Sequence, residues 1–299
     1  MKVAIIDLGT NTFHLLIADV EAGEPNIIYK TNEPVRLGED ITKANLIIST
    51  AFSRGITCLK EFKKTIDFYE ITTIKAIATS GVRSASNGQD FVDAAYKQTD
   101  IRIDTIDGDE EASYIYEGVK WSGAITEPAL IMDIGGGSTE FILCNQEKLI
   151  WKKSYNIGAA RLMQAFFKSD PINIDDQKKI QNHLDEQLTE LIHVCRNHRP
   201  QILIGSAGAF ESFAGMINTS LDIKKVSTAN IDYSAYQMLA IKLINANHEE
   251  RVRMDGLIPL RVDMIVMAAL LTSYVLEKLD LKQITLSTYD LKMGVLKSF

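Results

Sequence analysis

The sequence predicts an α/β protein built from two similar halves, and two observations support that prediction. One pattern occurs twice: an apolar run, an aspartate, a glycine turn rich in hydroxyl groups and a second apolar run, at residues 3–20 and 129–144. The composition is ordinary for a globular chain, and 299 residues are enough for two domains of roughly 100–200 residues each. We therefore expect domains at 1–124 and 125–288, with a C-terminal helix at 289–299 that packs back on the first domain.

The first half is expected to begin with three strands and then to alternate helices with strands. Apolar runs that end at turn residues predict strands at 3–6, 13–20, 26–32, 74–78 and 101–106. The break between the second and third strands falls at Gly23. Apolar residues spaced by three and four predict a long helix at 49–70, and shorter helices are expected at 89–98 and 110–119.

The second half repeats the opening order of strand, glycine turn, strand and strand. Its strands are expected at 129–132, 139–144, 148–156, 201–204 and 284–286. Its helices are expected at 158–168, 175–197, 233–247, 259–278 and 291–297. Asp175 follows Pro171 and is the expected N-cap of the second of these helices. The apolar stretch 264–276 is expected to belong to the core.

Charge and cysteine content exclude several classes of protein. The net charge of −7 argues against general binding of duplex nucleic acid or of a membrane surface, although a local basic groove could still hold a polyanion. The three cysteines are scattered and show no metal-ligand spacing, which favours a reducing compartment. No run approaches the roughly 20 apolar residues of a membrane span, so we expect a cytoplasmic protein.

The two glycine turns are the main candidate site. Glycine allows the backbone to approach a ligand closely, and hydroxyl and amide groups donate to phosphate oxygens. The predicted phosphate-binding residues of the turns are Gly9, Thr10, Asn11, Gly135, Gly136, Gly137 and Ser138. Asp7 and Asp133 end the preceding strands and could hold Mg²⁺, or each could close its turn through the backbone. Ligands bind beyond the carboxyl ends of strands in open sheets, so we expect phosphates between the halves.

Several other residues have both a chemical and an ordinary interpretation. Glu140 begins a buried strand and could position a water molecule or a metal ion. Glu111 lies in the first turn of a helix, where it could stabilise the helix dipole or act as a general base. Arg83 follows a buried strand and could grip a phosphate or lie on the surface. Gly205 and Gly208 form a third glycine turn, which is either a backbone cradle or only a turn.

The ordered set of these motifs resembles the exopolyphosphatase and guanosine pentaphosphate phosphatase family. The matching segments cover almost the whole chain and are residues 7–15, 78–83, 108–112, 133–140, 158–161, 205–208 and 259–263. The resemblance implies the two-domain fold shared with actin, hexokinase and acetate kinase. It also implies Mg²⁺-dependent hydrolysis of a terminal phosphoanhydride.

The resemblance also implies roles for single residues. It assigns catalysis to Glu111, the organisation of metal and water to Asp133 and Glu140, and phosphate binding to Arg83. The chain stops at Phe299 and so resembles the short, two-domain members. It departs from the family pattern at three positions: Ala209 replaces Thr or Ser, Tyr289 replaces Gly, and Lys292 replaces Arg.

The resulting hypothesis is a phosphatase whose substrate enters the cleft between the domains. The terminal phosphoryl group of polyphosphate, or the 5′-γ-phosphate of pppGpp, would be held by the two turns, with Mg²⁺ near Asp133 and Asp7. Glu111, assisted by Glu140, would activate water for in-line attack. Two alternatives remain open: a kinase of the same superfold, and a sensor that binds phosphate ligands without turnover. Whether the chain is a monomer or a homodimer also stays open.

Overall fold

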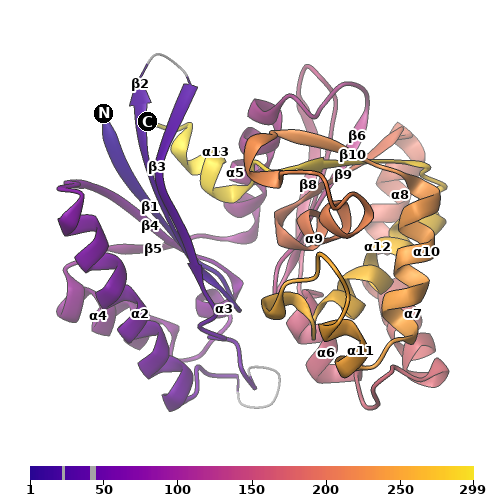
Figure 1. Cartoon of the computed structure of the whole chain (residues 1–299), viewed down its shortest axis with the longest axis horizontal. Coiled ribbons are helices and arrows are strands. Elements are labelled where there is room, and N and C mark those ends of the chain that lie inside the picture. The colour runs from indigo at the N-terminus through magenta and orange to yellow at the C-terminus, as the bar shows by residue number, and fades with distance from the viewer. Residues whose placement is uncertain (22–23, 41–44) are drawn as a thin grey trace.

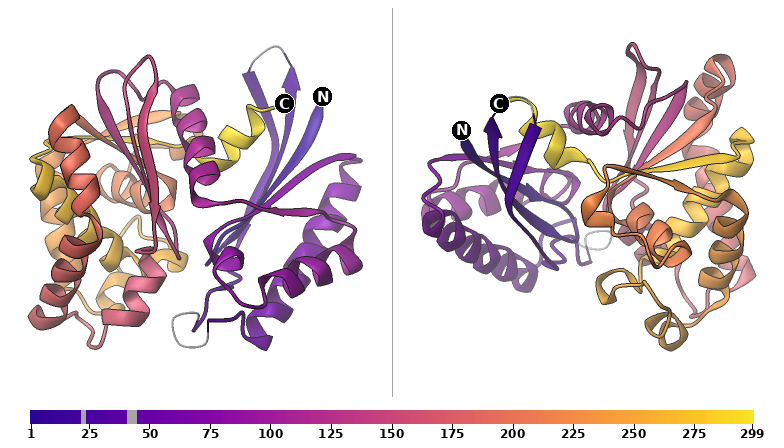
Figure 2. Two further views of the ribbon diagram at one scale, coloured as in Figure 1. Left: turned by 180° about the vertical axis from the view of Figure 1, so that it is seen from behind. Right: turned by 45° about the horizontal axis from the view of Figure 1, so that its top comes forward.

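Two mixed sheets, each flanked by helices, stand side by side in the computed structural model, as Figures 1 and 2 show. The structure describes residues 1–21, 24–40 and 45–299. Gly23, predicted at a hairpin break, lies outside the described residues. The architecture confirms the predicted α/β, actin-like fold with a duplicated mixed sheet.

The first sheet contains five strands in the order β3-β2-β1-β4-β5. Their bounds are β1 (Lys2–Leu8), β2 (Phe13–Glu21), β3 (Glu24–Glu33), β4 (Thr73–Ala78) and β5 (Ile103–Thr105). β1, β2 and β3 pair antiparallel, whereas β4 runs parallel to both β1 and β5. Apolar side chains on one face of this sheet pack against α2 (Ser49–Phe68) and α4 (Gly88–Thr99). The short helix α3 (Ser80–Arg83) follows β4 directly.

The second sheet contains six strands in the order β10-β11-β9-β6-β7-β8. Their bounds are β6 (Ala129–Ile134), β7 (Thr139–Cys144), β8 (Leu149–Tyr155), β9 (Ile202–Ser206), β10 (Thr228–Ile231) and β11 (Gln283–Ser287). Its α-helices are α6 (Ala159–Phe166), α7 (Ile174–Gln187), α8 (Thr189–His198), α9 (Ala207–Ile217), α10 (Tyr233–Asn245), α11 (His248–Val252) and α12 (Ile265–Leu279). Two 3₁₀ turns, η1 (Ile223–Lys225) and η2 (Pro259–Arg261), lie between them. α12 is largely buried, which confirms that this apolar stretch belongs to the core.

Two helices lie between the sheets and join them. α5 (Gly108–Ser122) connects the halves, and α13 (Leu291–Leu296) packs against α5 and β1 (Figure 1). Their buried side chains form one apolar cluster with residues from both sheets, including Ile5 of β1 and Ile131 of β6. We therefore propose domains at 1–124 and 125–288, and we assign the C-terminal helix α13 to the first domain.

The structure corrects four details of the sequence prediction. The helix expected at 175–197 is divided at Leu188 into α7 and α8, since Leu188 is buried and its backbone leaves the helical conformation. Asn173 rather than Asp175 is the N-cap, because its side chain accepts a hydrogen bond from the Asp176 backbone N–H. The helix expected from residue 259 begins only at Ile265, after η2.

The fourth correction concerns three short elements that were not predicted. α3 and β10 have four residues each, and α11 has five. Segments of that length are too short for a periodic apolar pattern to develop. No helix in the described ranges is both long enough and apolar enough to cross a membrane.

Candidate active site

The strand register of the second sheet places four polar residues in a row near the carboxyl end of β6. Asp133 pairs with Glu140 on β7 and with Ser206 on β9. Glu140 pairs in turn with Ser154 on β8. We call these four residues the second-half row. Its two carboxylates lie side by side and are almost fully buried.

The first sheet contains an equivalent row with different chemistry. Asp7, near the carboxyl end of β1, pairs with His14 on β2 and with Ile77 on β4. His14 pairs in turn with Asn32 on the edge strand β3. We call these four residues the first-half row. It holds one carboxylate, where the second-half row holds two.

Hydroxyl groups and burial set the protonation of the second-half row. Ser206 Oγ donates to Asp133 Oδ2 at 2.8 Å, and Ser154 Oγ donates to Glu140 Oε1 at 2.6 Å. Burial, and then repulsion from Glu140, raise the pKa of Asp133 to about 8. Burial also raises the pKa of Glu140, although its hydroxyl partners oppose the shift. Two desolvated acids in contact disfavour the ionised state of each other, so this row favours a bound cation.

The two glycine turns follow these rows and have the same internal hydrogen bond. The Gly9 N–H donates to the Thr12 carbonyl at 3.2 Å, and the Gly135 N–H donates to the Ser138 carbonyl at 3.0 Å. The two turns touch across the cleft, because a Cβ placed on Gly136 would lie 3.2 Å from Thr10 Cβ. At this point the two turns therefore leave no room for a ligand between them.

Thr10, Ser80 and Gly137 meet where the two turns touch. A Cβ on Gly137 would lie 2.6 Å from both Thr10 Oγ1 and Ser80 Oγ, so this position requires glycine. The Ser80 Oγ atom is buried and has no hydrogen-bond partner in the described part of the chain. A buried hydroxyl without a partner is costly unless a ligand or water satisfies it.

Glu111 lies in the first turn of α5, where Asp107 caps the helix by accepting from the Glu110 N–H. The Arg83 side chain, from α3, donates from Nη1 to Glu111 Oε2 at 3.0 Å and to the Ile106 carbonyl at 2.8 Å. Burial, and then the charge of Glu140, raise the pKa of Glu111 well above its usual range, while Arg83 opposes this shift. A carboxylate with a raised pKa in a cavity can accept a proton near neutral pH.

The C-terminal segment adds an ion pair to the first-half row. Lys292 Nζ, at the start of α13, lies 2.6 Å from Asp290 Oδ2 and 3.8 Å from Asp7 Oδ2. Burial raises the pKa of Asp7 to about 6, and the Lys292 charge limits that rise. Burial alone would raise the pKa of Asp290, but Lys292 and Lys30 bring it down to about 2.

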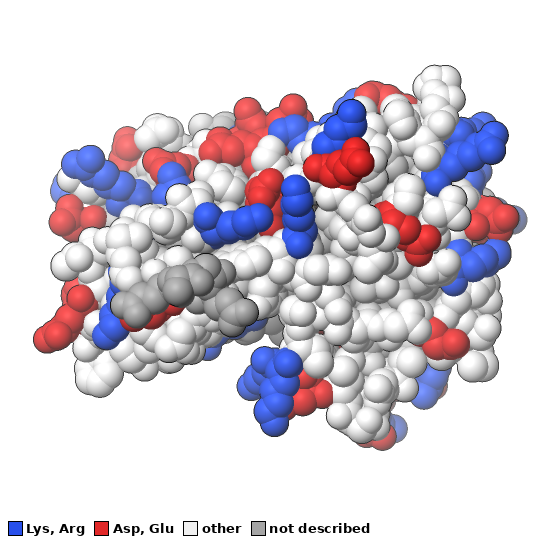
Figure 3. Space-filling view, turned by 90° about the horizontal axis from the view of Figure 1, so that it is seen from above, with Lys and Arg blue, Asp and Glu red and all other residues white. Residues whose placement is uncertain are grey.

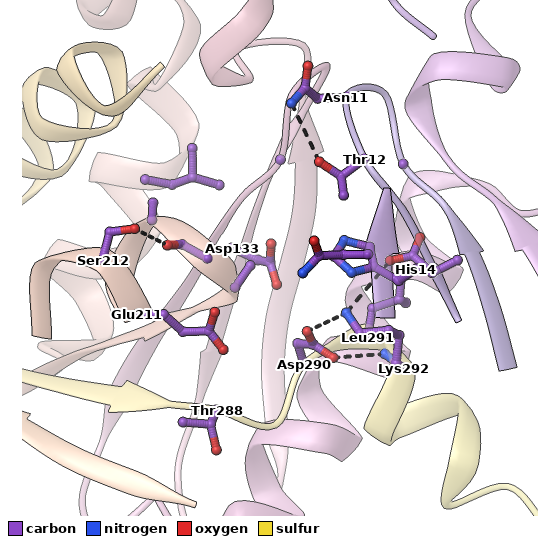
Figure 4. A pocket seen from close by; sticks show the side chains of 18 of the residues that line it. Asn11, Thr12, His14, Asp133, Glu211, Ser212, Thr288, Asp290, Leu291 and Lys292 are labelled. Atoms are coloured by element: carbon purple, nitrogen blue, oxygen red, sulfur yellow. Dashed lines mark hydrogen bonds and ion pairs between the residues drawn. The ribbon is translucent and has the colours of Figure 1, made fainter. Parts of the chain in front are cut away.

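Figure 4 shows these groups from close by. Asp133 and Glu211 lie on one side of the pocket, and His14, Asp290 and Lys292 lie on the other. Burial and the charge of Lys292 lower the pKa of His14 well below its usual range, so its imidazole is neutral. The pocket therefore brings side chains from both halves to one space.

This pocket is a cavity of about 1000 Å³, at the upper end of the range for ligand sites. It brings together most of the predicted site residues: Asp7, Gly9, Thr10, Asn11, Glu111, Asp133, Gly135, Gly136, Gly137, Ser138, Glu140 and Gly208. The three positions that depart from the family pattern, Ala209, Tyr289 and Lys292, also line it. Tyr289 does not project freely, because its ring packs edge-on against Trp121 with 5.9 Å between ring centroids.

Two predicted residues do not line the cavity. Arg83 acts through its contact with Glu111. Gly205 lies in β9 with its α-carbon against the ring of Phe210, so it is a packing glycine rather than part of a phosphate cradle.

Sequence reasoning missed several lining residues. Arg261, in η2, packs its guanidinium against the α-carbon of Gly208, and its Nε has no partner among the described residues. Its only sequence signal was its place in the matched segment 259–263. Other missed lining residues include His14, Ser80, Glu211 and Asp290.

The residues of the cavity fit a divalent cation in the way Mg²⁺ is usually held. The described residues contain no cluster of three or more His, Cys, Asp or Glu side chains that could hold a metal ion alone. Mg²⁺ is commonly bound by one or two carboxylates together with water and substrate phosphates. Asp133 and Glu140, which are buried and side by side, could supply such carboxylates.

Comparison with known proteins supports a phosphatase assignment. The model of the Ppx/GppA phosphatase family matches residues 16–299. A bifunctional 3-dehydroquinate synthase/phosphatase from Fusobacterium nucleatum is 33% identical over 98% of this chain. The chain spans less than half of that protein, 46% of its length. A putative exopolyphosphatase from Haemophilus influenzae is 27% identical, with 99% of this chain and 91% of that protein covered.

Solved structures show the same relationship. An exopolyphosphatase from Cytophaga hutchinsonii is 36% identical and superposes with a TM-score of 0.96, covering 100% of this chain and 97% of that one. The Ppx/GppA family member from Aquifex aeolicus is 26% identical with a TM-score of 0.82, and the same shares are covered. The family match over nearly the whole length, together with the shared fold, shows that this chain belongs to the Ppx/GppA phosphatase family.

Proposed function

We propose that the protein is a Mg²⁺-dependent phosphatase that removes the terminal phosphoryl group of inorganic polyphosphate. The observation that carries this proposal is the position of Glu111. This buried carboxylate lines the same cavity as Asp133, Glu140 and both glycine turns, and it lies within electrostatic reach of Glu140. The printed names of the Cytophaga and Haemophilus relatives support the choice of polyphosphate.

Substrate binding is assigned to donors on both sides of the cavity. Backbone N–H groups and hydroxyls of the two turns, including Thr10 and Ser138, would hold the terminal phosphoryl oxygens. The unpartnered Ser80 hydroxyl and the Arg261 guanidinium would add donors from two further segments. Phosphoryl transfer needs chiefly positioning and charge stabilisation, which such donors supply.

Glu111 is assigned the role of general base. Its raised pKa suits a group that accepts a proton, and Arg83 fixes the carboxylate and opposes the rise in its pKa. Glu140, held by Ser154, would orient the same water molecule. The oxygen of that water attacks the terminal phosphorus in line with the bridging oxygen that leaves.

Mg²⁺, when bound, would neutralise charge on the phosphates and on the leaving oxygen. We propose that Asp133 is its principal protein ligand. Asp7 already faces the Lys292 ammonium at 3.8 Å, whereas Asp133 has only the neutral Ser206 hydroxyl. Asp7 would then contribute charge near the ion, through water.

The 5′-γ-phosphate of pppGpp is a second candidate substrate, and one feature of the cavity favours it. The cavity lining includes the apolar residues Ala209, Ile223, Val226, Ile258 and Met264. A nucleobase is flat and largely apolar, so apolar lining of this kind could accept it.

The test is phosphate release from polyphosphate and from pppGpp, measured side by side with and without Mg²⁺. We expect Mg²⁺-dependent release in the absence of any acceptor, which a kinase would not give. Glu111→Gln should lower kcat by ~10²-fold or more while binding persists. The matched control is Glu110→Gln, which changes the exposed neighbour in the same helical turn.

Two results would overturn the proposal. Binding of both substrates without turnover by the wild-type protein would favour a sensor. Equal activity of the Glu111→Gln variant and the wild type would remove Glu111 as the base.

A further inference from the structure

The sequence contains four pairs of adjacent lysines, and the structure distinguishes one of them. Three pairs lie on outer surfaces or between elements and make local contacts: Lys63 with Asp67, Lys64 with Glu61, Lys152 with Ser113, Lys153 with Glu190, and Lys179 with Asp176. The fourth pair, Lys224 and Lys225 of η1, lines the central cavity. Sequence alone could not make this selection.

A third lysine lines the same cavity from the opposite half. Lys30 lies on the edge strand β3, paired with Leu16, two positions along the strand from Asn32 of the first-half row. Its charge acts on Asp290 and His14, so it lies within electrostatic reach of the cavity floor. The cavity lining therefore extends from Asp7 to Lys30 on the edge strand of the first sheet.

In the second half, the same cavity is lined by residues beside the edge strand of the second sheet. η1 leads into β10, which is the edge strand next to β11, and residues 224–227 line the cavity with Thr288. Figure 3 views the molecule from above, and Lys and Arg side chains gather near the middle of that face, with acidic side chains beside them. The cavity lining thus includes lysines from both halves.

These three lysines are available to a ligand. All three are exposed, and neither Lys30 nor Lys224 forms an ion pair with any residue in ranges 1–21, 24–40 and 45–299. Lys225 contacts only Asp222 at 3.2 Å, and its side chain is 81% exposed. An exposed pair of this kind is worth at most about 1 kcal/mol, so a phosphate can replace it.

We propose that Lys30, Lys224 and Lys225 form a basic exit that holds the internal phosphates of a linear polyphosphate chain. The proposal rests on the proposed function, since it assumes that the chain end lies near Glu111 and Asp133. The chain would run from the cavity floor between β3 and η1 to solvent. Each lysine would attract the phosphates as a single positive charge. It would not form the paired hydrogen bonds that an arginine guanidinium forms with a phosphate.

A short substrate and a long one should therefore respond differently to loss of the basic exit. Tripolyphosphate occupies mainly the cavity floor, whereas a chain of tens of phosphates also passes the lysines. Three exposed charge contacts of about 0.5–1 kcal/mol each correspond to roughly 10-fold or more in affinity. The same contacts should make binding of the long chain more sensitive to salt.

The experiment compares the triple variant Lys30→Gln, Lys224→Gln, Lys225→Gln with the wild-type protein. We expect the KM for long-chain polyphosphate to rise about 10-fold or more, and the KM for tripolyphosphate to rise less than about 3-fold. The control is Lys63→Gln, Lys64→Gln, Lys178→Gln, which removes the same charge from residues that do not line the cavity. Equal changes for both substrates, or a control with the same effect, would overturn the basic exit.

Equilibrium binding of long-chain polyphosphate in EDTA separates this proposal from the proposed function. If the wild type releases no phosphate from either substrate, the proposed function fails. Binding that weakens in the triple variant, and not in the control, would still support the basic exit. Binding that is the same in all three proteins would overturn it.

Discussion

Asp7 and Asp133 occupy equivalent positions in the two halves, yet their surroundings differ in charge. Asp133 contacts a serine hydroxyl and lies beside a second acid, Glu140. Asp7 lies beside a neutral histidine, and a lysine from the C-terminal segment approaches it to 3.8 Å. One duplicated backbone therefore carries two adjacent acids in its second half and a carboxylate near an ammonium group in its first.

This difference indicates a division of labour. In the proposed mechanism, the second-half row supplies the carboxylates that hold a divalent cation and orient water. The first half supplies the hydroxyl-rich turn, the Arg83–Glu111 pair and the Lys292 ammonium. Neither half alone contains the complete set of groups that phosphoryl transfer requires.

The largest expected effect comes from neutralising the two aspartates in turn. Asp133→Asn should lower kcat by about 10²–10³-fold, because it removes charge stabilisation from the reacting phosphate. Asp7→Asn should lower kcat by only about 10-fold, since Lys292 already offsets the Asp7 charge. Steady-state phosphate release at saturating Mg²⁺ measures kcat for both variants. An equal loss of kcat in the two variants would contradict the difference between Asp133 and Asp7.

Removing Arg83 should shift the pH dependence of the reaction. Arg83 lowers the pKa of Glu111, so Arg83→Met should raise that pKa and leave the base protonated at higher pH. We expect the acidic limb of the kcat profile to move up by about 1 pH unit. Lys75→Met, which breaks the exposed pair with Asp104, is the control and should leave the profile unchanged.

Stability without Mg²⁺ should fall as the pH rises. The pKa of Asp133 is about 8 in the folded protein against an ordinary 3.8, so the folded state binds the extra proton. Between pH 4 and pH 8 the unfolded chain has lost this proton while the folded protein keeps it, so the free energy of unfolding decreases as the pH rises. Asp133→Asn should be more stable than the wild type by about 1–3 kcal/mol at pH 8. Urea unfolding in EDTA measures this, and a variant that is less stable at pH 8 would contradict it.

The smallest expected effect concerns the outer members of the two rows. Ser154→Ala removes the donor to Glu140 and should lower kcat by about 10-fold, which corresponds to one hydrogen bond to a charged group. Asn32→Ala, at the equivalent position of the first-half row, should change kcat by less than about 3-fold. A larger effect at Asn32 would place the reacting group nearer to the first sheet.

Much of the site could be predicted because it is local in sequence. Strand, aspartate and glycine turn follow one another directly, so the positions of Asp7 and Asp133 relative to Thr10 and Ser138 needed no tertiary information. The cross-strand contact of Asp133 with Glu140 also follows from a short hairpin.

The rest depends on segments that are distant in sequence. Lys292 meets Asp7 because the last helix packs back against the first strand, and Arg261 meets Gly208 only through the packing of η2 on α9. Gly205 was misassigned because a glycine pattern does not reveal a packed Phe210 ring. The division of the helix at Leu188 results from burial of that side chain, which helical spacing does not encode.

The most direct test of the asymmetry between the halves is equilibrium binding of Mn²⁺, followed by electron paramagnetic resonance, to the wild type and to the two aspartate variants. The account predicts that Asp133→Asn weakens Mn²⁺ binding by about 100-fold, while Asp7→Asn weakens it by less than about 10-fold. Equal loss in the two variants, or a greater loss in Asp7→Asn, would contradict the assignment of the cation to the second-half row.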